Sequence, residues 1–316
     1  MTAGVLIAAV VLDVSCGDPW WFPHPVRLMG RMITWYERYI RYLASGRMGE
    51  IVAGVVLAVG LPALWYAVTY WLIELSMAAH EIIGKLTEVL LAYTALAARD
   101  LRDHAVVVGR ALDAQSLDQA RRAVSRMVGR DTAGLSEPDI VRATVETIAE
   151  STSDGVIAPL FYLVIGGPPL ALAYKAVNTL DSMVGHLDEP YRYFGWASAR
   201  LDDLANWIPA RVTACLVIAA VGLRFRSVAR MRYAWTVFRR DGGKHPSPNS
   251  GQAEAAMAGA LQVQLGGVNY YEGTPTRRPL LGVTERPLVS TCIREAVSIM
   301  WLASFLGAGL GACFLS

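Results

Sequence analysis

The sequence has few charged residues and few cysteines for its length. Asp, Glu, Lys and Arg make up 18% of its 316 residues, against roughly 25% in soluble domains, whereas hydrophobic residues reach 54%. The four cysteines have no C-x-x-C spacing, so neither a zinc site nor a disulfide framework is indicated. A formal charge of only +2 does not produce the basic field that nucleic-acid-binding proteins use. Low charge and high hydrophobicity together indicate a membrane protein that binds no nucleic acid.

Five apolar stretches predict membrane spans, at residues 51–73, 81–98, 155–175, 205–223 and 296–315. The first is uncharged over 23 residues and has Trp and Tyr towards one end, which is typical of a spanning helix with an interfacial anchor. Residues 166–169 (GGPP) interrupt the third, and broken helices at membrane depth occur where they line a protein cavity. The second contains three charged residues, so an interfacial amphipathic helix is an alternative there.

The basic residues predict how the chain is oriented. Segments 15–50, 98–154 and 224–295 contain five, eight and eleven Lys or Arg, which is 24 of the 29 in the sequence. The positive-inside rule places such segments in the cytoplasm, and the five spans put all three on one side. We therefore expect a multi-pass protein of the inner membrane with its active site on the cytoplasmic side.

The fold class follows from the periodicity between the spans. Ser136 followed by Glu, Pro and Asp predicts a capped helix over residues 137–151. Ser116 and Gln119 predict a second capping box. No alternation of apolar and polar residues is long enough to predict a sheet. We expect a single all-α membrane domain covering residues 1–316.

A first candidate site consists of the carboxylates Glu146, Glu150 and Asp154. Their spacing of four residues places them on one helical stripe, just before an apolar segment begins. Three stacked carboxylates repel one another unless a cation lies among them, and Mg²⁺ with nucleotide phosphates is a suitable partner. The alternative is a solvated stripe in which Arg142 pairs with Glu146.

A second group of polar residues follows the broken apolar segment and precedes the next span. Polar groups next to membrane segments are costly unless they have a partner or a function. The alternative for part of this group is a structural ion pair between Arg200 and Asp203. The group consists of Lys175, Asn178, Asp181, Arg200, Asp202 and Asp203.

Two further segments are candidates for ligand binding. Residues 240–251 are rich in Gly, basic and hydroxyl-bearing side chains and contain His245, Ser247 and Asn249, ahead of a helix that we expect to begin near Glu254. Such a loop can bind phosphate through its amides and the helix N-terminus, although it lacks the Walker spacing and an ordinary linker is the alternative. Residues 23–30 contain His24 and Arg27, and the proline after His24 favours an extended backbone.

Taken in order, these segments resemble the adenosylcobinamide-phosphate synthase family of cobalamin biosynthesis, the CobD/CbiB family. The resemblance covers residues 12–282 and includes two departures, Glu150-Ser151 where the family commonly has Glu-Asn, and Gln252-Ala253 after Gly251. It rests on Gly-Asp-Pro at 17–19, PHPVRLMG at 23–30, ARDL at 98–101, VGRDT at 128–132, DGVIAPLFY at 154–162, YKAVNTLDSMVG at 174–185, ASARLDD at 197–203, NWIPAR at 206–211 and HPSPNSG at 245–251 through LGG at 265–267.

The resemblance implies a ligase that forms an amide bond with the use of ATP. A propionate of the corrinoid adenosylcobyric acid would be activated, through an acyl phosphate, and attacked by the amine of (R)-1-aminopropan-2-ol phosphate or aminopropanol. The product would be adenosylcobinamide phosphate or adenosylcobinamide. ATP and Mg²⁺ are the implied cofactors, the corrinoid is a substrate, and the implied partners are the bilayer and other late corrinoid-pathway enzymes.

We assign the candidate residues two roles. The catalytic and metal-binding set is Glu146, Glu150, Asp154 and Asp181. The substrate- and phosphate-binding set is His24, Arg27, Lys175, Asn178, Arg200, Asp202, Asp203, His245, Ser247, Asn249 and Glu254. Two alternatives remain open, a membrane prenyl- or alcohol-phosphate transferase with the same Mg²⁺–carboxylate chemistry and a non-catalytic scaffold for corrinoid enzymes.

Overall fold

A computed structural model describes residues 1–19, 21–44, 46–185 and 190–316. The chain is 75% helical, which confirms the prediction of an all-α membrane protein. The expectation that no segment forms a sheet is wrong, because residues Leu265–Tyr271 and Thr274–Leu281 pair as an antiparallel hairpin. Residues 186–189, which lie between the third and fourth predicted spans, are outside the described residues.

The chain divides into two compact units. Unit 1 consists of Met1–Ala97, Ala158–Asn206 and Ala308–Ser316, and unit 2 of Ala98–Ile157 and Trp207–Gly307. Each unit is therefore built from segments that are far apart in the sequence.

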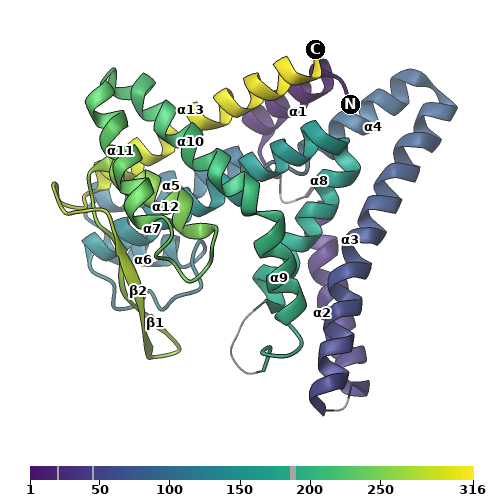
Figure 1. The fold of residues 1–316 in the computed structure, drawn as a ribbon, viewed down its shortest axis with the longest axis horizontal. Coiled ribbons are helices and arrows are strands. Elements are labelled where there is room, and N and C mark those ends of the chain that lie inside the picture. The colour runs from purple at the N-terminus through teal and green to yellow at the C-terminus, as the bar shows by residue number, and fades with distance from the viewer. Residues whose placement is uncertain (20, 45, 186–189) are drawn as a thin grey trace. The chain divides into compact units, whose positions relative to one another are not determined.

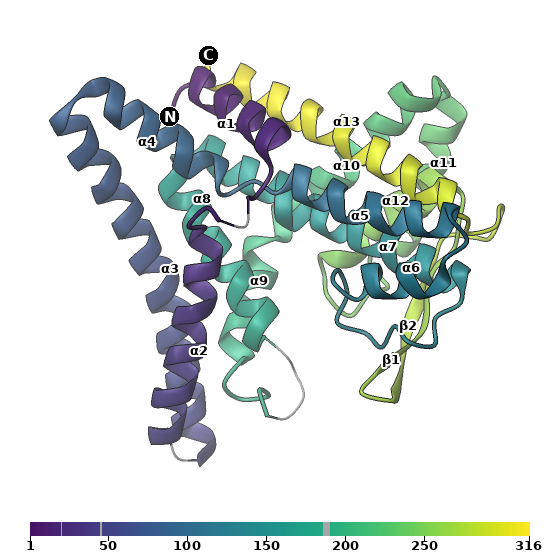
Figure 2. The ribbon, with the colours of Figure 1, turned by 180° about the vertical axis from the view of Figure 1, so that it is seen from behind.

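Unit 1 contains six complete helices and the C-terminal end of another among its described residues. Helix α3 packs against α4, α8 and α9, and Figures 1 and 2 both show α2 alongside α3. The helices are α1 (Ala3–Cys16), α2 (Pro25–Leu43), α3 (Gly46–Ala79), α4 (Glu81–Tyr93), α8 (Ala158–Val184) and α9 (Trp196–Ala205).

Helix α8 is broken where the sequence predicts it. Gly167 has a φ of +67°, and Pro168 and Pro169 follow it inside the helix. A left-handed backbone is readily adopted by glycine, and proline cannot donate the hydrogen bond that would continue the helix. The predicted interruption at residues 166–169 is confirmed.

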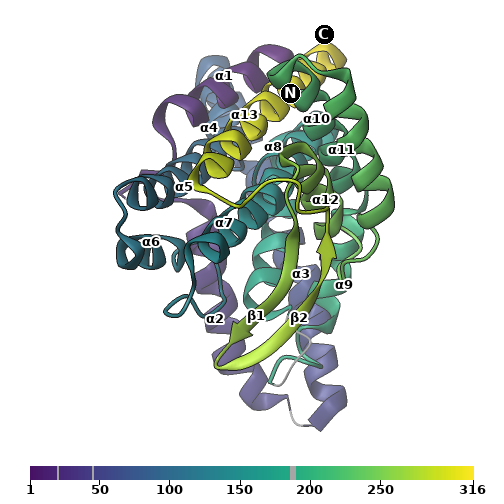
Figure 3. The same ribbon diagram turned by 90° about the vertical axis from the view of Figure 1, so that its left-hand side faces the viewer.

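Unit 2 is organised around helix α12, which is buried at every position from Gly251 to Leu261. Helices α7, α10 and α11 and both strands pack against it, and Figure 3 shows the strands side by side. The elements are α5 (Ala98–Asp113), α6 (Leu117–Val124), α7 (Glu137–Thr152), the π-helix η1 (Ser153–Ile157), α10 (Trp207–Phe225), α11 (Val228–Asp241), α12 (Ser250–Leu261), β1 (Leu265–Tyr271), β2 (Thr274–Leu281) and most of α13 (Ser290–Leu315).

The helix-start predictions have different outcomes in α7 and α6. Helix α7 begins at Glu137 with a complete capping box, in which the Asp139 amide donates to Ser136 Oγ and the Ser136 amide donates to Asp139 Oδ2. Ser116 does precede α6, but its side chain makes no capping hydrogen bond. The capping box predicted for Ser116 and Gln119 is therefore wrong.

Four helices in the described part of the chain have the length and apolar composition needed to cross a membrane. They are Gly46–Ala79, Glu137–Val184 (which runs through α7, η1 and α8), Trp207–Phe225 and Ser290–Leu315. The segment predicted as a span at 81–98 contains the 13-residue helix α4. At about 1.5 Å per residue such a helix is shorter than the roughly 30 Å hydrocarbon core, so α4 is not one of the four.

Candidate functional site

Helix α12 places an ionisable side chain in the interior of unit 2. Glu254 lies in its second turn and is 3% exposed. Most of its neighbours along the helix are Ala and Gly, so the elements around α12 approach it closely. Because a charged carboxylate is costly away from water, the groups around Glu254 decide which form it takes.

The protonated form of Glu254 is favoured. Burial raises the pKa of this carboxyl well above its usual range, and the nearby carboxylates of Glu150 and then Glu146 raise it further. Arg278 and Arg130 act in the opposite direction. Carboxyls that repel one another in this way can share a proton, and a cation between them would allow both to ionise. A cation at Glu254 and Glu150 would therefore relieve the repulsion between them.

The Glu146 carboxylate is bound by two arginines and by a backbone amide of the hairpin. Arg130 Nη2 donates to its Oε2 at 2.6 Å, and both side chains are less than 10% exposed. Arg142 Nη1 lies 4.0 Å from Oε1, and the Gly266 amide donates to Oε1 at 2.8 Å. The predicted pairing with Arg142 is present, but the burial of Glu146 rules out a solvated stripe at this position.

The hairpin is attached to α7 at Gly266. Arg142 donates to the carbonyl oxygens of Gly266 and, at 3.1 Å, Val268. Gly266 has a φ of +83°, and a Cβ there would lie 2.0 Å from the carbonyl oxygen of Pro279. This position therefore requires glycine, which permits the close approach of β1 to β2, while the bonds from Arg142 hold β1 to α7.

Asn269 on β1 presents an unused donor. Its Oδ1 accepts a hydrogen bond of 2.8 Å from Arg130. The residue is 2% exposed, and its Nδ2 has no hydrogen-bond partner among the described residues. Buried amide groups are normally satisfied, so this donor is suited to an acceptor that a ligand supplies.

The loop before α12 brings two more donors together. The Ser247 amide donates to His245 Nδ1 at 3.1 Å, and His245 Nε2 lies 2.8 Å from Arg278 Nη1. A guanidinium has only donors, and a neutral imidazole has one donor and one acceptor. Burial and then Arg278 lower the pKa of His245 to about 4, so the ring is neutral at neutral pH. With Nδ1 accepting, Nε2 carries the proton beside a second donor, which favours an anionic oxygen between them.

The start of α12 is linked to α7 through Glu150. Ser250 Oγ donates to Glu150 Oε1 at 3.2 Å. Ser247 Oγ accepts from the amides of Asn249 and Ser250, at 3.2 and 3.4 Å, which fixes the loop. Unit 2 thus brings together six of the predicted residues: Glu146, Glu150, His245, Ser247, Asn249 and Glu254. Asp154 also belongs to unit 2 and lies in the π-helix η1, a type of turn often found at functional sites.

The other predicted residues belong to unit 1. His24 lies 3.4 Å from Asp18, and Arg27 donates to the carbonyl of Phe22 at 2.6 Å. Asn178 approaches Asp202 at 3.5 Å. The ion pair between Arg200 and Asp203 is present at 3.7 Å, as the structural alternative predicted. Lys175 and Asp181 lie on α8 with Asn178.

The donor set determines how a magnesium ion would fit. No group of three or more His, Cys, Asp or Glu in residues 1–19, 21–44, 46–185 and 190–316 is placed to hold a metal ion, and both oxygens of Glu146 already accept protein hydrogen bonds. Mg²⁺ usually takes one or two carboxylates and completes its shell with water and phosphate. Glu150 and Glu254 fit that requirement. The assignment of Glu146, Glu150, Asp154 and Asp181 as metal ligands stays a prediction.

Sequence reasoning missed the basic and amide side chains of this site: Arg130, Arg278 and Asn269. Arg130 lies within the VGRDT motif, but Arg278 and Asn269 lie in the hairpin that was not expected. Asn269 is hydrophilic and lies on a strand that also contains glycines, so its sequence context gives no signal of burial. A search for charges able to neutralise the buried carboxylates would have been the only route to them.

Comparison with known proteins gives a consistent result over nearly the whole chain. The family model described as "CobD/Cbib protein" matches residues 6–300. The chain belongs to the CobD/CbiB protein family. This membership confirms the resemblance found in the sequence, and it supports a role in cobalamin biosynthesis.

The alignments with curated relatives cover almost the full length of this chain and of each relative. "Cobalamin biosynthesis protein CobD" of Geobacter metallireducens is 50% identical over 305 residues, which is 96% of this chain and 93% of that protein. The protein of the same name from Halalkalibacterium halodurans is 44% identical over 93% of this chain and 91% of its own. "Cobalamin biosynthesis protein CbiB" of Salmonella typhimurium is 44% identical, with coverages of 98% and 96%. No solved structure matches the chain.

Proposed function

We propose that this member of the CobD/CbiB family is an ATP-dependent ligase. It would join the amine of (R)-1-aminopropan-2-ol phosphate, or of aminopropanol, to a propionate of adenosylcobyric acid. The product would be adenosylcobinamide phosphate or adenosylcobinamide. The observation that carries the proposal is a group of four side chains in unit 2, the buried Glu254 and the half-buried Glu150, His245 and Arg278. This group combines carboxylates suited to a cation with donors suited to an anion.

The reaction is an amide synthesis in two steps. An oxygen of the corrinoid carboxylate attacks the γ-phosphorus of ATP, and ADP leaves. The neutral amine nitrogen then attacks the acyl carbon, the bond to the phosphate oxygen breaks, and the phosphate departs with a proton from nitrogen. Each step moves negative charge onto phosphate oxygens, so catalysis depends on positioning and on groups that stabilise this charge.

Two groups of described residues would bind different parts of the substrates, one the phosphate oxygens and the other Mg²⁺. Arg278 and the His245 Nε2–H are donors that would hold phosphate oxygens, and the free Nδ2 of Asn269 would donate to a carbonyl or phosphate oxygen. Glu150 and Glu254 would hold Mg²⁺, which neutralises nucleotide phosphate charge when bound. Glu254 would hold the ion in its charged form, so it would give up its proton to the solvent when Mg²⁺ is bound.

The arginines around Glu146 have a supporting role. Arg130 bonds both Glu146 and Asn269, and Arg142, which belongs to α7, bonds the carbonyl oxygen of Val268 on β1. These bonds fix the hairpin against α7 and so position Asn269 and Arg278. Fixed donors lose little entropy when a ligand binds, which is an advantage in catalysis.

Incubation of the purified, detergent-solubilised protein with ATP, Mg²⁺, adenosylcobyric acid and (R)-1-aminopropan-2-ol phosphate tests the proposal. The amide product and an equal amount of ADP should appear by mass spectrometry, and neither should appear when ATP is left out. Amide formation that does not need ATP would contradict the ligase. Transfer of a phosphorylated alcohol to a lipid would support the prenyl- or alcohol-phosphate transferase. An absence of turnover by protein that binds the corrinoid would support the scaffold.

A further inference from the structure

Unit 2 contains a pocket that is basic and has an apolar wall. Its volume is about 890 Å³, within the range of ordinary ligand sites. Five arginines line it, against the single carboxylate of Asp113, which leaves a formal charge of +4. The arginines are Arg102, Arg110, Arg224, Arg226 and Arg294.

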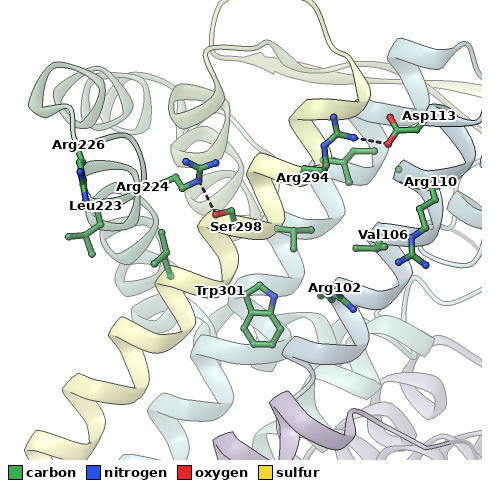
Figure 4. Close-up of a pocket in the computed structure, with 14 residues that line it drawn as sticks. Arg102, Val106, Arg110, Asp113, Leu223, Arg224, Arg226, Arg294, Ser298 and Trp301 are labelled. Carbon is green, nitrogen blue, oxygen red and sulfur yellow. Dashed lines mark hydrogen bonds and ion pairs between the residues drawn. The ribbon is translucent and has the colours of Figure 1, made fainter.

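The side chains of two of the five arginines bond no other group in the described part of the chain. Figure 4 shows Arg294 bonded to Asp113, at 2.7 Å, and Arg224 bonded to the Ser298 hydroxyl, at 3.0 Å. Arg102 pairs with Asp103 at the edge of the pocket. No ion pair or hydrogen bond engages the Arg110 or Arg226 guanidinium among the residues that the structure describes. Like charges gathered in this way are unfavourable unless an anion joins them.

The backbone at Arg226 supports a role for this side chain. Arg226 has a φ of +48°, which is uncommon for a residue with a Cβ. It directly follows α10, at the position where helices usually end in glycine. The chain thus keeps an arginine where glycine would relieve the backbone, and this arginine lies on the pocket.

The pocket lies at the ends of two helices that are apolar and long enough to cross a membrane. Leu223 and Arg224 belong to the last turn of α10, and Ile293 to Leu302 belong to the first half of α13. From this basic end the lining continues along α13 to Val297, Trp301 and Leu302. A ligand with a phosphate head and apolar chains matches both parts, whereas a free phosphate would leave the apolar wall unused.

We propose that this pocket binds the phosphate of an anionic phospholipid headgroup. Basic residues at the ends of membrane helices attract anionic lipids, and arginine holds phosphate oxygens in a fork of parallel hydrogen bonds. The pocket shares no residue with the group formed by Glu150, Glu254, His245 and Arg278. The lipid would hold the ends of α10 and α13 next to α5, from which Arg102 and Arg110 come.

Binding of lipids to the full-length protein in neutral detergent tests this proposal. Phosphatidylglycerol and phosphatidylcholine with identical acyl chains are titrated by native mass spectrometry, and inorganic phosphate is added as a competitor in a third series. The wild-type protein should prefer phosphatidylglycerol, and phosphate should not displace it. Equal binding of the two lipids, or displacement of phosphatidylglycerol by phosphate at similar concentration, would overturn the proposal.

Substitutions locate the binding. Arg110→Gln and Arg226→Gln should each weaken phosphatidylglycerol binding about fivefold, which corresponds to about 1 kcal/mol for a basic residue near an anionic headgroup. The triple variant that adds Arg224→Gln should lose the preference over phosphatidylcholine. All three side chains are exposed, so the variants should fold. Arg122→Gln makes the same change at an exposed position of α6 that does not line the pocket. Equal losses in this control and in the pocket variants would contradict the assignment.

Discussion

Glu254 is a titratable group inside a helix that is buried on every side. Its pKa is raised by burial and by Glu150 and Glu146, so the native state keeps a proton that the unfolded chain loses above pH 4.5. Stability that depends on such a proton is present below the unfolded pKa and is lost as pH rises through the folded pKa. Ligand-free protein should therefore become less stable with increasing pH in this window.

Thermal unfolding of the wild type and of Glu254→Gln between pH 4 and pH 8 measures this effect. The free energy of unfolding of the wild type should fall, relative to the variant, by about 1.4 kcal/mol per pH unit above 4.5 until the folded pKa is reached. His245, whose pKa is lowered to about 4, has the opposite effect up to about 6.5, but it is common to both proteins and cancels in the difference. A difference that does not vary with pH would show that Glu254 is ionised in the native state.

Glu150 should control the response to magnesium. Glu150→Gln removes one charge at nearly constant volume, so the protein should stay folded while amide formation at limiting Mg²⁺ falls about tenfold or more, a typical cost of losing a metal-site interaction. Excess Mg²⁺ should restore part of the activity. Glu272→Gln, at an exposed position of the hairpin turn, is the control and should behave as the wild type. Mg²⁺ titration curves of Glu150→Gln and wild type that superimpose would remove Glu150 from the metal site.

Individual residues were predictable where the signal is local. The carboxylates Glu146 and Glu150 stand out because they repeat every four residues beside an apolar segment. Their partners do not, because Gly266 is 120 positions from Glu146 along the chain. The sequence could therefore indicate which carboxylates matter but not that Glu146 is used for an ion pair with Arg130. The hairpin, which the sequence did not predict, holds this ion pair in place, because Asn269 bonds Arg130 and the Gly266 amide bonds Glu146.

At the scale of elements, α7 has local sequence signals that predict it, whereas the hairpin depends on contacts with distant parts of the chain. Helix α7 was located because Ser136 and the acidic first turn are adjacent start signals. The strands have no clean alternation: β1 contains Gly266 and Gly267, and β2 contains two prolines and two neighbouring arginines. These strands are held by contacts with α7 and α12, so tertiary packing outweighs their weak intrinsic propensity.

Gly266 connects the hairpin with the site, and its replacement should affect both. Gly266→Ala places a Cβ against the Pro279 carbonyl and requires a left-handed backbone of alanine. The protein should lose about 3 kcal/mol of stability or more, and activity should fall further than the folded fraction does because Arg278 and Asn269 are displaced. Thermal unfolding and amide formation measure the two effects.

Gly129→Ala is the matched control for this change. None of the residues that the structure describes comes within 4 Å of a Cβ at Gly129, and the Gly129 backbone is not left-handed. It should alter stability by less than about 1 kcal/mol and leave activity unchanged. If Gly266→Ala behaved in the same way, the close approach of β1 to β2 and α7 would not be needed for function.

At the scale of the whole molecule, hydropathy found the four apolar helices, whereas the fifth predicted span depends on charge alone. Helix α4 has 13 residues, which is short for a crossing. The charge distribution nevertheless requires an even number of crossings between segments 15–50 and 98–154, and again between 98–154 and 224–295, if all three are to share one side. A second crossing besides α3 is therefore needed before residue 98. Hydrophobicity therefore gives four crossings and charge gives five. The two schemes differ in whether the short segment between α3 and α4 lies on the same side of the membrane as segment 224–295.

Reporter fusions at Ala78, Gly134 and Gly243 decide between these counts. We expect Ala78 to lie on the opposite side from Gly243, because that arrangement puts all three basic segments in the cytoplasm. Four crossings, without α4, would place Ala78 and Gly243 on the same side. Gly134 should match Gly243 in either case, because the same two crossings, Glu137–Val184 and Trp207–Phe225, lie between them in both schemes, so it is the internal control. A match between Ala78 and Gly243 would remove α4 from the membrane and leave the basic segment 15–50 on the far side.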